Sequence, residues 1–299
     1  MNAQNSNPSQ PSTATGTSRQ VTTTTPVTGS SQDVNNRFDN LRSLEIKQIE
    51  EKTINGNPLD EVIERVYRKP NKEELRLLAP SPELLVKYAG FLSQPETGIV
   101  RLNGNSDCAE SAAVVNAKEN CLPYSMPGAG TAYSFRTESY RAPHLSDLIL
   151  SKNVLITDGV LQQGIMVNLG NIPLEEVSLQ TKGLKYLVDF TPVSNSEDLS
   201  KFDDLLSKGV NSDGFLYRLG FYAADQTTFA LRSIAYKGNV TRSFKGKSYN
   251  EMDFDKRKDV IVAFRVVEQR PDGSVTILWK VLARRNAPTL KIDEKNNRK

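Results

Sequence analysis

The strongest structural signal in the sequence is a long β-hairpin near its C-terminal end. Two runs rich in β-branched residues, 259–269 and 274–285, flank the turn Arg-Pro-Asp-Gly at 270–273. Proline presets the backbone angle at the first turn position, and glycine accepts the positive φ that a tight turn needs. Both alternating faces of the first run are largely apolar near its start. This pattern predicts a central strand that is covered on both sides.

Shorter runs rich in β-branched and aromatic residues precede this hairpin. They are 98–102, 131–136, 145–150, 154–157, 160–169, 184–190, 214–222 and 227–236. The connections are short and contain little helix, which favours antiparallel pairing over β-α-β units. One clear helix is predicted at 195–208, with Phe202, Leu205 and Leu206 facing inward.

Residues 33–97 show helical periodicity instead. Amphipathic helices are predicted at 33–53, 58–68, 72–78 and 82–92. Asn71 and Glu74 have the spacing of a capping box for the third of these helices. None is long enough to be stable alone, so they must pack against another part of the chain. The sequence therefore predicts an α+β fold, with N-terminal amphipathic helices packed on a mainly antiparallel β-domain at 98–290 that ends in the hairpin.

The two ends of the chain have a different composition. Residues 1–32 are almost entirely small and polar, with many serines and threonines, and residues 291–299 are charged and polar. Neither segment can bury enough apolar surface to offset the entropy lost on ordering. Both ends are predicted to be disordered tails.

The charge balance narrows the classes of partner. The chain has 38 lysines and arginines against 35 aspartates and glutamates, which gives a net charge of +3. This value gives no electrostatic reason to expect a nucleic-acid partner. No apolar run is long enough to cross a bilayer. The sequence leaves the oligomeric state open.

The N-terminal residues bear on the compartment. They have neither the basic start nor the apolar stretch of a signal peptide. The even cysteine count and the serine- and threonine-rich tail favour an exported protein whose signal peptide has been removed. Such a protein is periplasmic, cell-surface or extracellular. Without a removed signal peptide, the expectation is a cytoplasmic protein.

The two cysteines, Cys108 and Cys121, are close enough in sequence to form a disulfide across a short loop. Two unpaired core thiols and a reactive cysteine are the alternatives. Their spacing is too wide for a Cys-x-x-Cys redox pair. Because the chain has one histidine, cysteine and histidine alone cannot supply the four ligands of a structural zinc site.

The one histidine of the chain, His144, is the candidate general base of the alternative hydrolase site. Asp147 could orient it, and Cys108 could serve as the nucleophile. No Gly-x-Ser-x-Gly motif accompanies them. The sequence favours a surface or loop histidine, with the hydrolase site as the alternative.

Asn103, Asn105 and Asp107 place side-chain oxygens at alternate positions, as a calcium loop does. The pattern departs from that motif, because Cys108 replaces the glycine and Val114 replaces the final glutamate. Asx turns are therefore predicted here, with a metal site as the weaker alternative. No cofactor is predicted.

Three functions remain compatible with these features. The favoured one is a non-catalytic exported or envelope-associated binding or structural protein, with an unknown protein or glycan ligand. The first alternative is a hydrolase-type enzyme that uses His144 with a nearby acid and nucleophile. The second is a cytoplasmic partner-binding protein that docks through the helix at 33–53.

Overall fold

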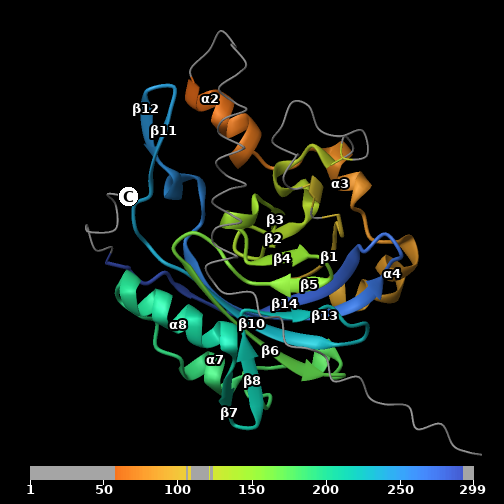
Figure 1. Ribbon diagram of the computed structural model, residues 1–299. Coiled ribbons are helices and arrows are strands. Elements are labelled where there is room, and N and C mark those ends of the chain that lie inside the picture. The colour runs from red at the N-terminus through yellow and green to blue at the C-terminus, as the bar shows by residue number, and fades with distance from the viewer. Residues whose placement is uncertain (1–57, 106, 109–120, 122–123, 292–299) are drawn as a thin grey trace, which may run out of the picture.

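The computed structural model describes residues 58–105, 107–108, 121 and 124–291 (Figure 1). The predicted tail at 1–32, the predicted helix at 33–53 and residues 292–299 lie outside this part. Lys291 is described, and it pairs with Asn195 in an isolated bridge. The described residues form an α+β fold dominated by antiparallel sheet, which confirms the predicted fold class.

A seven-stranded sheet forms the centre of the molecule. Its strands, in spatial order, are β1 (Thr97–Leu102), β14 (Val275–Asn286), β13 (Lys258–Gln269), β10 (Thr228–Ala235), β6 (Gln162–Gly170), β8 (Phe215–Arg218) and β7 (Val210–Ser212). Every neighbouring pair is antiparallel. Strand β13 lies inside the sheet, where Phe264 faces Trp279 of β14 and Phe229 of β10.

The predicted C-terminal hairpin is confirmed. Its turn is closed by two backbone hydrogen bonds, from Gly273 N–H to the Arg270 oxygen (2.9 Å) and from Arg270 N–H to the Ser274 oxygen (3.0 Å). Gly273 has a φ of 79°, the left-handed conformation that glycine adopts at little cost.

A second sheet of five strands covers one face of the first. Its order is β3 (Ser139–Tyr140), β2 (Ala132–Ser134), β4 (Leu148–Ser151), β5 (Val154–Ile156) and β9 (Gly220–Tyr222). A core rich in aromatic residues fills the space between the sheets, with Phe135 against Phe264 and Trp279. This layer explains why one face of β13 is apolar.

Helices cover the opposite face of the large sheet. They are α7 (Lys185–Asp189), α8 (Ser196–Lys208), α5 (Ala89–Leu92) and the 3-10 helix η5 (Leu174–Glu176). Their buried side chains pack on Ile261, Ala263 and Val267, which lie on the second apolar face of β13. The molecule therefore has three layers, small sheet, large sheet and helices, and β13 is covered on both sides as predicted.

Two predictions in this helical layer are wrong. The run 184–190 was expected to be a strand but contains helix α7. Leu184 and Leu187 are buried three residues apart, while Lys185 and Asp189 form an exposed ion pair four residues apart, and both spacings are helical. In α8, Leu206 is buried as expected, but Leu205 is 54% exposed.

The described N-terminal helices follow the predicted pattern closely. Helix α2 (Pro58–Val62) continues as the π-helical turn η1 (Ile63–Tyr67), and α3 spans Lys72–Leu77. The predicted helix at 82–92 is divided at Tyr88 into α4 (Pro82–Lys87) and α5. Leu78 enters the core between the sheets and Phe91 the core under the helices, so this segment packs on the β-domain as predicted.

A second hairpin was not predicted. It consists of β11 (Thr241–Phe244) and β12 (Lys247–Asn250), and the 3-10 helix η6 (Glu251–Phe254) follows it. Lys245 and Gly246 form its turn, both with positive φ. Phe244 and Met252 pack with Val66 of η1, which joins this hairpin to the N-terminal helices.

Candidate functional site

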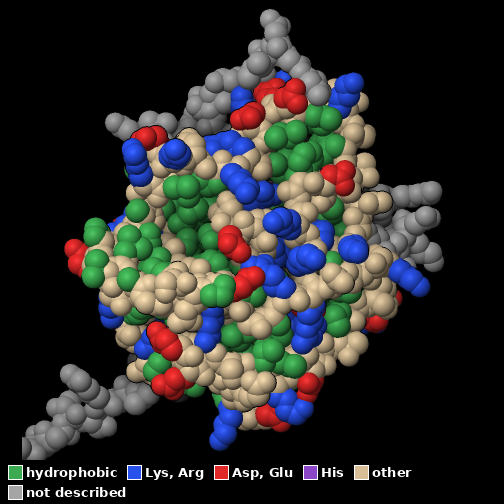
Figure 2. All heavy atoms as spheres, turned by 180° about the vertical axis from the view of Figure 1, so that it is seen from behind, with side chains coloured by type: hydrophobic (Ala, Val, Ile, Leu, Met, Phe, Trp, Pro, Cys, Tyr) green, Lys and Arg blue, Asp and Glu red, His purple; other side chains and the backbone are tan. Residues whose placement is uncertain are grey.

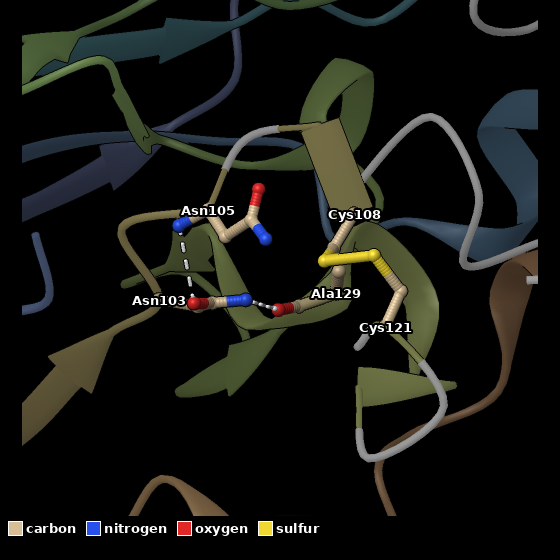
Figure 3. Close-up of a disulfide and its surroundings, with 5 residues drawn as sticks. All are labelled: Asn103, Asn105, Cys108, Cys121 and Ala129. Atoms are coloured by element: carbon tan, nitrogen blue, oxygen red, sulfur yellow. Dashed lines mark hydrogen bonds between the residues drawn. A yellow bond between two sulfur atoms is a disulfide. The ribbon is translucent and has the colours of Figure 1, made fainter. Parts of the chain in front are cut away.

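Cys108 and Cys121 form a disulfide (Figure 3). Their Cα atoms are 5.2 Å apart, within the usual range for a disulfide. Both side chains are buried and pack against Ala129, in the 3-10 turn η3 (Pro127–Gly130). The bond therefore joins two positions between β1 and η3, and it packs against the turn that precedes β2. The predicted pairing is present, and neither cysteine is a free thiol in this structure.

Asn103 adopts the predicted Asx turn beside the disulfide. Its side-chain oxygen accepts the Asn105 N–H at 3.2 Å, and its Nδ2 donates to the Ala129 oxygen at 3.0 Å (Figure 3). Asn103 thus organises its own loop and holds η3. Within the part of the chain that the structure describes, no group of three or more His, Cys, Asp or Glu is placed to hold a metal ion. The weaker prediction of a metal site at Asn103, Asn105 and Asp107 therefore gains no support from the described residues.

His144 is buried, so it is not the surface histidine that the sequence favoured as one of two possibilities. It lies in the 3-10 helix η4 (Pro143–Leu145), and its Nε2 is 3.1 Å from Oε1 of Glu251. The same oxygen accepts the Tyr67 hydroxyl at 2.9 Å, and Oε2 accepts Arg242 Nε at 3.2 Å. The buried Glu251 carboxylate therefore gathers groups from η1, η4 and β11, which are far apart in the sequence.

Asp147, the predicted partner of His144, makes a different set of contacts. Its carboxylate accepts hydrogen bonds from Ser134 (3.1 Å), Ser233 (2.5 Å) and the backbone N–H and Nε of Arg136 (3.1 and 2.7 Å). Asp147 precedes β4 of the small sheet, and Ser233 lies in β10 of the large sheet. The carboxylate therefore connects the two sheets.

Arg136 extends this connection into a buried ionic network that sequence analysis missed. Its guanidinium also donates to Asp255 (2.7 Å) and Gln162 (2.9 Å), and Arg257 donates to the same Asp255 oxygen at 2.7 Å. Burial and the charge of Arg136 lower the pKa of Arg257 to about 10. Each charged group here has a counterion, while Oδ1 of Asp255 is buried without a hydrogen-bond partner. Such pairing of buried charges is typical of structural support between layers.

The three residues proposed for a hydrolase thus bind separate partners. Cys108 is bonded to Cys121, His144 contacts Glu251, and Asp147 contacts Arg136. The Tyr67 hydroxyl shares Oε1 of Glu251 with His144. Burial, followed by the Glu251 charge, raises the Tyr67 pKa far above its usual range. A phenol with so high a pKa is a poor nucleophile.

A cavity of about 440 Å³ lies beside α7, between residues 179–183 and the turn that joins β7 to β8. Its lining combines apolar side chains, including Leu179 and Phe215, with charged ones, including Lys182 and Asp213. No sequence motif marked this site, because its walls come from segments about 30 residues apart, each with ordinary loop composition.

The surface also exposes several large apolar side chains on α3 and α4. They are Leu75, Leu77, Leu85 and Val86, and Val86 is 78% exposed. Hydrophobic side chains are visible at the left edge of Figure 2, where α4 lies in that view. These residues lie on two short helices.

Comparison with known proteins finds no family model, no curated protein and no solved structure that matches this chain. Among the described residues, no helix has the length and apolar character needed to span a membrane. Fold and site geometry are therefore the basis for any functional argument.

Proposed function

We propose that this chain is a non-catalytic exported or envelope-associated binding protein, with a protein or glycan as its ligand. The observation that carries the proposal is the buried Cys108–Cys121 disulfide. Disulfides form and persist in oxidising compartments and are rare in the cytosol of most organisms. The separation of His144, Asp147 and Cys108 among different partners supports the non-catalytic part.

Thiol counting on natively expressed protein tests the compartment. A maleimide reagent is applied to the denatured protein, with and without prior reduction. We expect no labelled cysteine before reduction and two after it. Two thiols that react before reduction would contradict the proposal, because an exported protein with this pair is oxidised.

The hydrolase alternative keeps one supporting observation, the buried contact between His144 and Glu251. It is tested with generic ester and peptide substrates, by comparing the wild type with His144→Gln. Turnover by the wild type that the variant loses, while its melting temperature is retained, would favour the enzyme. We expect no turnover by either protein.

A further inference from the structure

The cavity beside α7 has the size and the apolar floor of a small-molecule site. Its volume of about 440 Å³ falls within the range of ligand pockets. Leu179, Val188 and Phe215 line it, and each is partly buried. These side chains offer an apolar surface that a ligand could cover.

The wall of the cavity is held in place without a ligand. Ser178 N–H donates to Thr181 Oγ1 at 2.9 Å, and Leu184 N–H donates to the Thr181 oxygen at 3.0 Å. The Tyr217 hydroxyl donates to the Gly183 oxygen at 2.9 Å, which fixes this loop to β8. A Cβ added at Gly183 would lie 3.0 Å from the Phe215 ring, so loop and floor are in close contact. The site is therefore largely preformed.

The cavity carries charges of both signs. Lys185 and Asp189 form an ion pair with each other. In the described part of the chain, the ammonium of Lys182 and the carboxylate of Asp213 take part in no hydrogen bond or ion pair. The hydrogen bond with Asp189 raises the pKa of the Lys185 ammonium most, and the Asp213 charge also acts on Lys185 and contributes to raising that pKa. Lys182 and Asp213 are thus the cation and the anion of the cavity that lie outside the Lys185–Asp189 pair, in addition to its apolar floor.

We infer that this cavity binds a short peptide with free termini, or a single apolar amino acid, whose carboxylate meets Lys182 and whose ammonium meets Asp213. This inference rests on the proposed non-catalytic binding function, and its ligand is smaller than the protein or glycan proposed there. An apolar side chain of the ligand covers Phe215 and Leu179.

NMR titration of the ¹⁵N-labelled full chain, with its disulfide intact, tests this assignment. The probes are Ala-Leu-Ala with free termini, its N-acetylated form, its C-terminal amide, the doubly blocked peptide and free leucine. We expect shift changes confined to 179–189 and 213–215, with a Kd for the free peptide on the order of 0.1 mM. Each blocked terminus should weaken binding by about fivefold, the effect of one exposed ion pair.

Two variants test the contributions of the Lys182 and Asp213 charges one at a time. Lys182→Gln should weaken the free peptide by about fivefold but leave the C-terminal amide unchanged, because the amide has no carboxylate to lose. Asp213→Asn should likewise weaken binding of the free peptide by about fivefold but leave binding of the N-acetylated peptide unchanged, because that peptide has no ammonium. Asparagine tolerates the φ of 51° at this position. Lys201→Gln on the exposed face of α8 is the matched control. It should change the affinity for neither the free peptide nor the blocked peptides.

Equal binding of the free and doubly blocked peptides would overturn the charge assignment. Absence of shift changes at 179–189 with every probe, or shift changes there with a neutral sugar only, would overturn the peptide site. If free leucine binds as tightly as the tripeptide, the ligand is the amino acid. The thiol count and the absence of turnover do not depend on these results, so failure of the site and failure of the proposed function are distinguishable.

Discussion

The Cys108–Cys121 bond joins residues 13 positions apart in the sequence, and both side chains are buried. On the chain-entropy model, a loop of this length restricts the unfolded chain by about 3 kcal/mol. The double variant Cys108→Ala, Cys121→Ala should therefore lower the free energy of unfolding by about 3 kcal/mol. Denaturant titration measures this value.

Reductant provides the control for the disulfide prediction. It should lower the stability of the wild type by a similar amount and leave the double variant unchanged. Equal stability of oxidised and reduced wild type would show that the bond constrains little.

Asp203 on α8 has a carboxylate oxygen, Oδ1, that is buried without a hydrogen-bond partner. Burial, followed by the charges of Asp158 and Asp204, raises the Asp203 pKa well above its usual value of 3.8. The folded state therefore holds the proton more tightly than the unfolded state, and stability falls as the pH rises through the folded-state pKa. We expect Asp203→Asn to stabilise the protein by about 1 kcal/mol at pH 7.

Thermal unfolding between pH 4 and pH 8 measures the effect of Asp203→Asn. The advantage of the variant should shrink towards pH 4, where the wild-type carboxyl is protonated. Asp225→Asn, at an exposed position between β9 and β10, is the control. A variant that is less stable than the wild type at pH 7 would contradict the prediction.

Among the elements, α3 shows how a local motif fixes a helix start. The Asn71 side chain accepts the Glu74 N–H at 3.0 Å, and the Glu74 carboxylate accepts the Asn71 N–H at 2.8 Å. Arg68 donates to both Glu74 oxygens. Burial opposes ionisation, but the bonds from Arg68 and Asn71 keep the Glu74 pKa below its usual value of 4.5.

Because the Glu74 pKa is depressed by folding, its contribution is present above about pH 4.5 and is lost as the pH falls through the folded-state value. Glu74→Gln should cost about 1–2 kcal/mol at pH 7 and converge with the wild type in acid. Chemical unfolding at pH 7 and pH 3 measures the difference. A cost that is the same at both pH values would show that the charge of Glu74 is not involved.

Elements that depend on neighbouring residues could be predicted from the sequence, and long-range contacts could not. The capping box of α3, the turn at 270–273 and the two apolar faces of β13 are all local patterns. Glu251, which contacts His144, is 107 residues away from it, and Asp255, which contacts Arg136, is 119 residues away. No local pattern predicts these contacts. Helix α7 was mistaken for a strand because a five-residue helix spans too few turns to show its period.

In the candidate site, too, local features could be predicted from the sequence and long-range ones could not. The pairing of Cys108 with Cys121 was predicted from their proximity in the sequence. The cavity beside α7 was missed, because it arises only when 179–189 folds over the turn between β7 and β8. Its charged residues resemble ordinary surface charges until the fold places them around one space.

At the scale of the whole molecule, β13 is the strand on which both cores depend. Phe264 is fully buried between the sheets, in contact with the rings of Phe135 and Phe229. Phe264→Ala removes these contacts and leaves a cavity, so we expect a loss of about 3–5 kcal/mol. Such a loss is a large share of the stability of a typical domain.

Denaturant unfolding with circular dichroism and tryptophan fluorescence measures the effect of Phe264→Ala, since Trp279 lies in the same core. Val86→Ala, at a largely exposed position, is the control and should change stability by less than about 0.5 kcal/mol. Similar losses in the two variants would contradict the central role of β13.

The order of the large sheet also governs when the protein can fold during its synthesis. Strand β14 is the common neighbour of β1 and β13, and Ile99 pairs with Leu278 near the other end of the described chain. A nascent polypeptide that stops before Val275 has made β1 but not the strand that β1 pairs with. Pairing of such distant segments slows folding. The ribosome must therefore deliver the chain as far as β14 before β1 can pair.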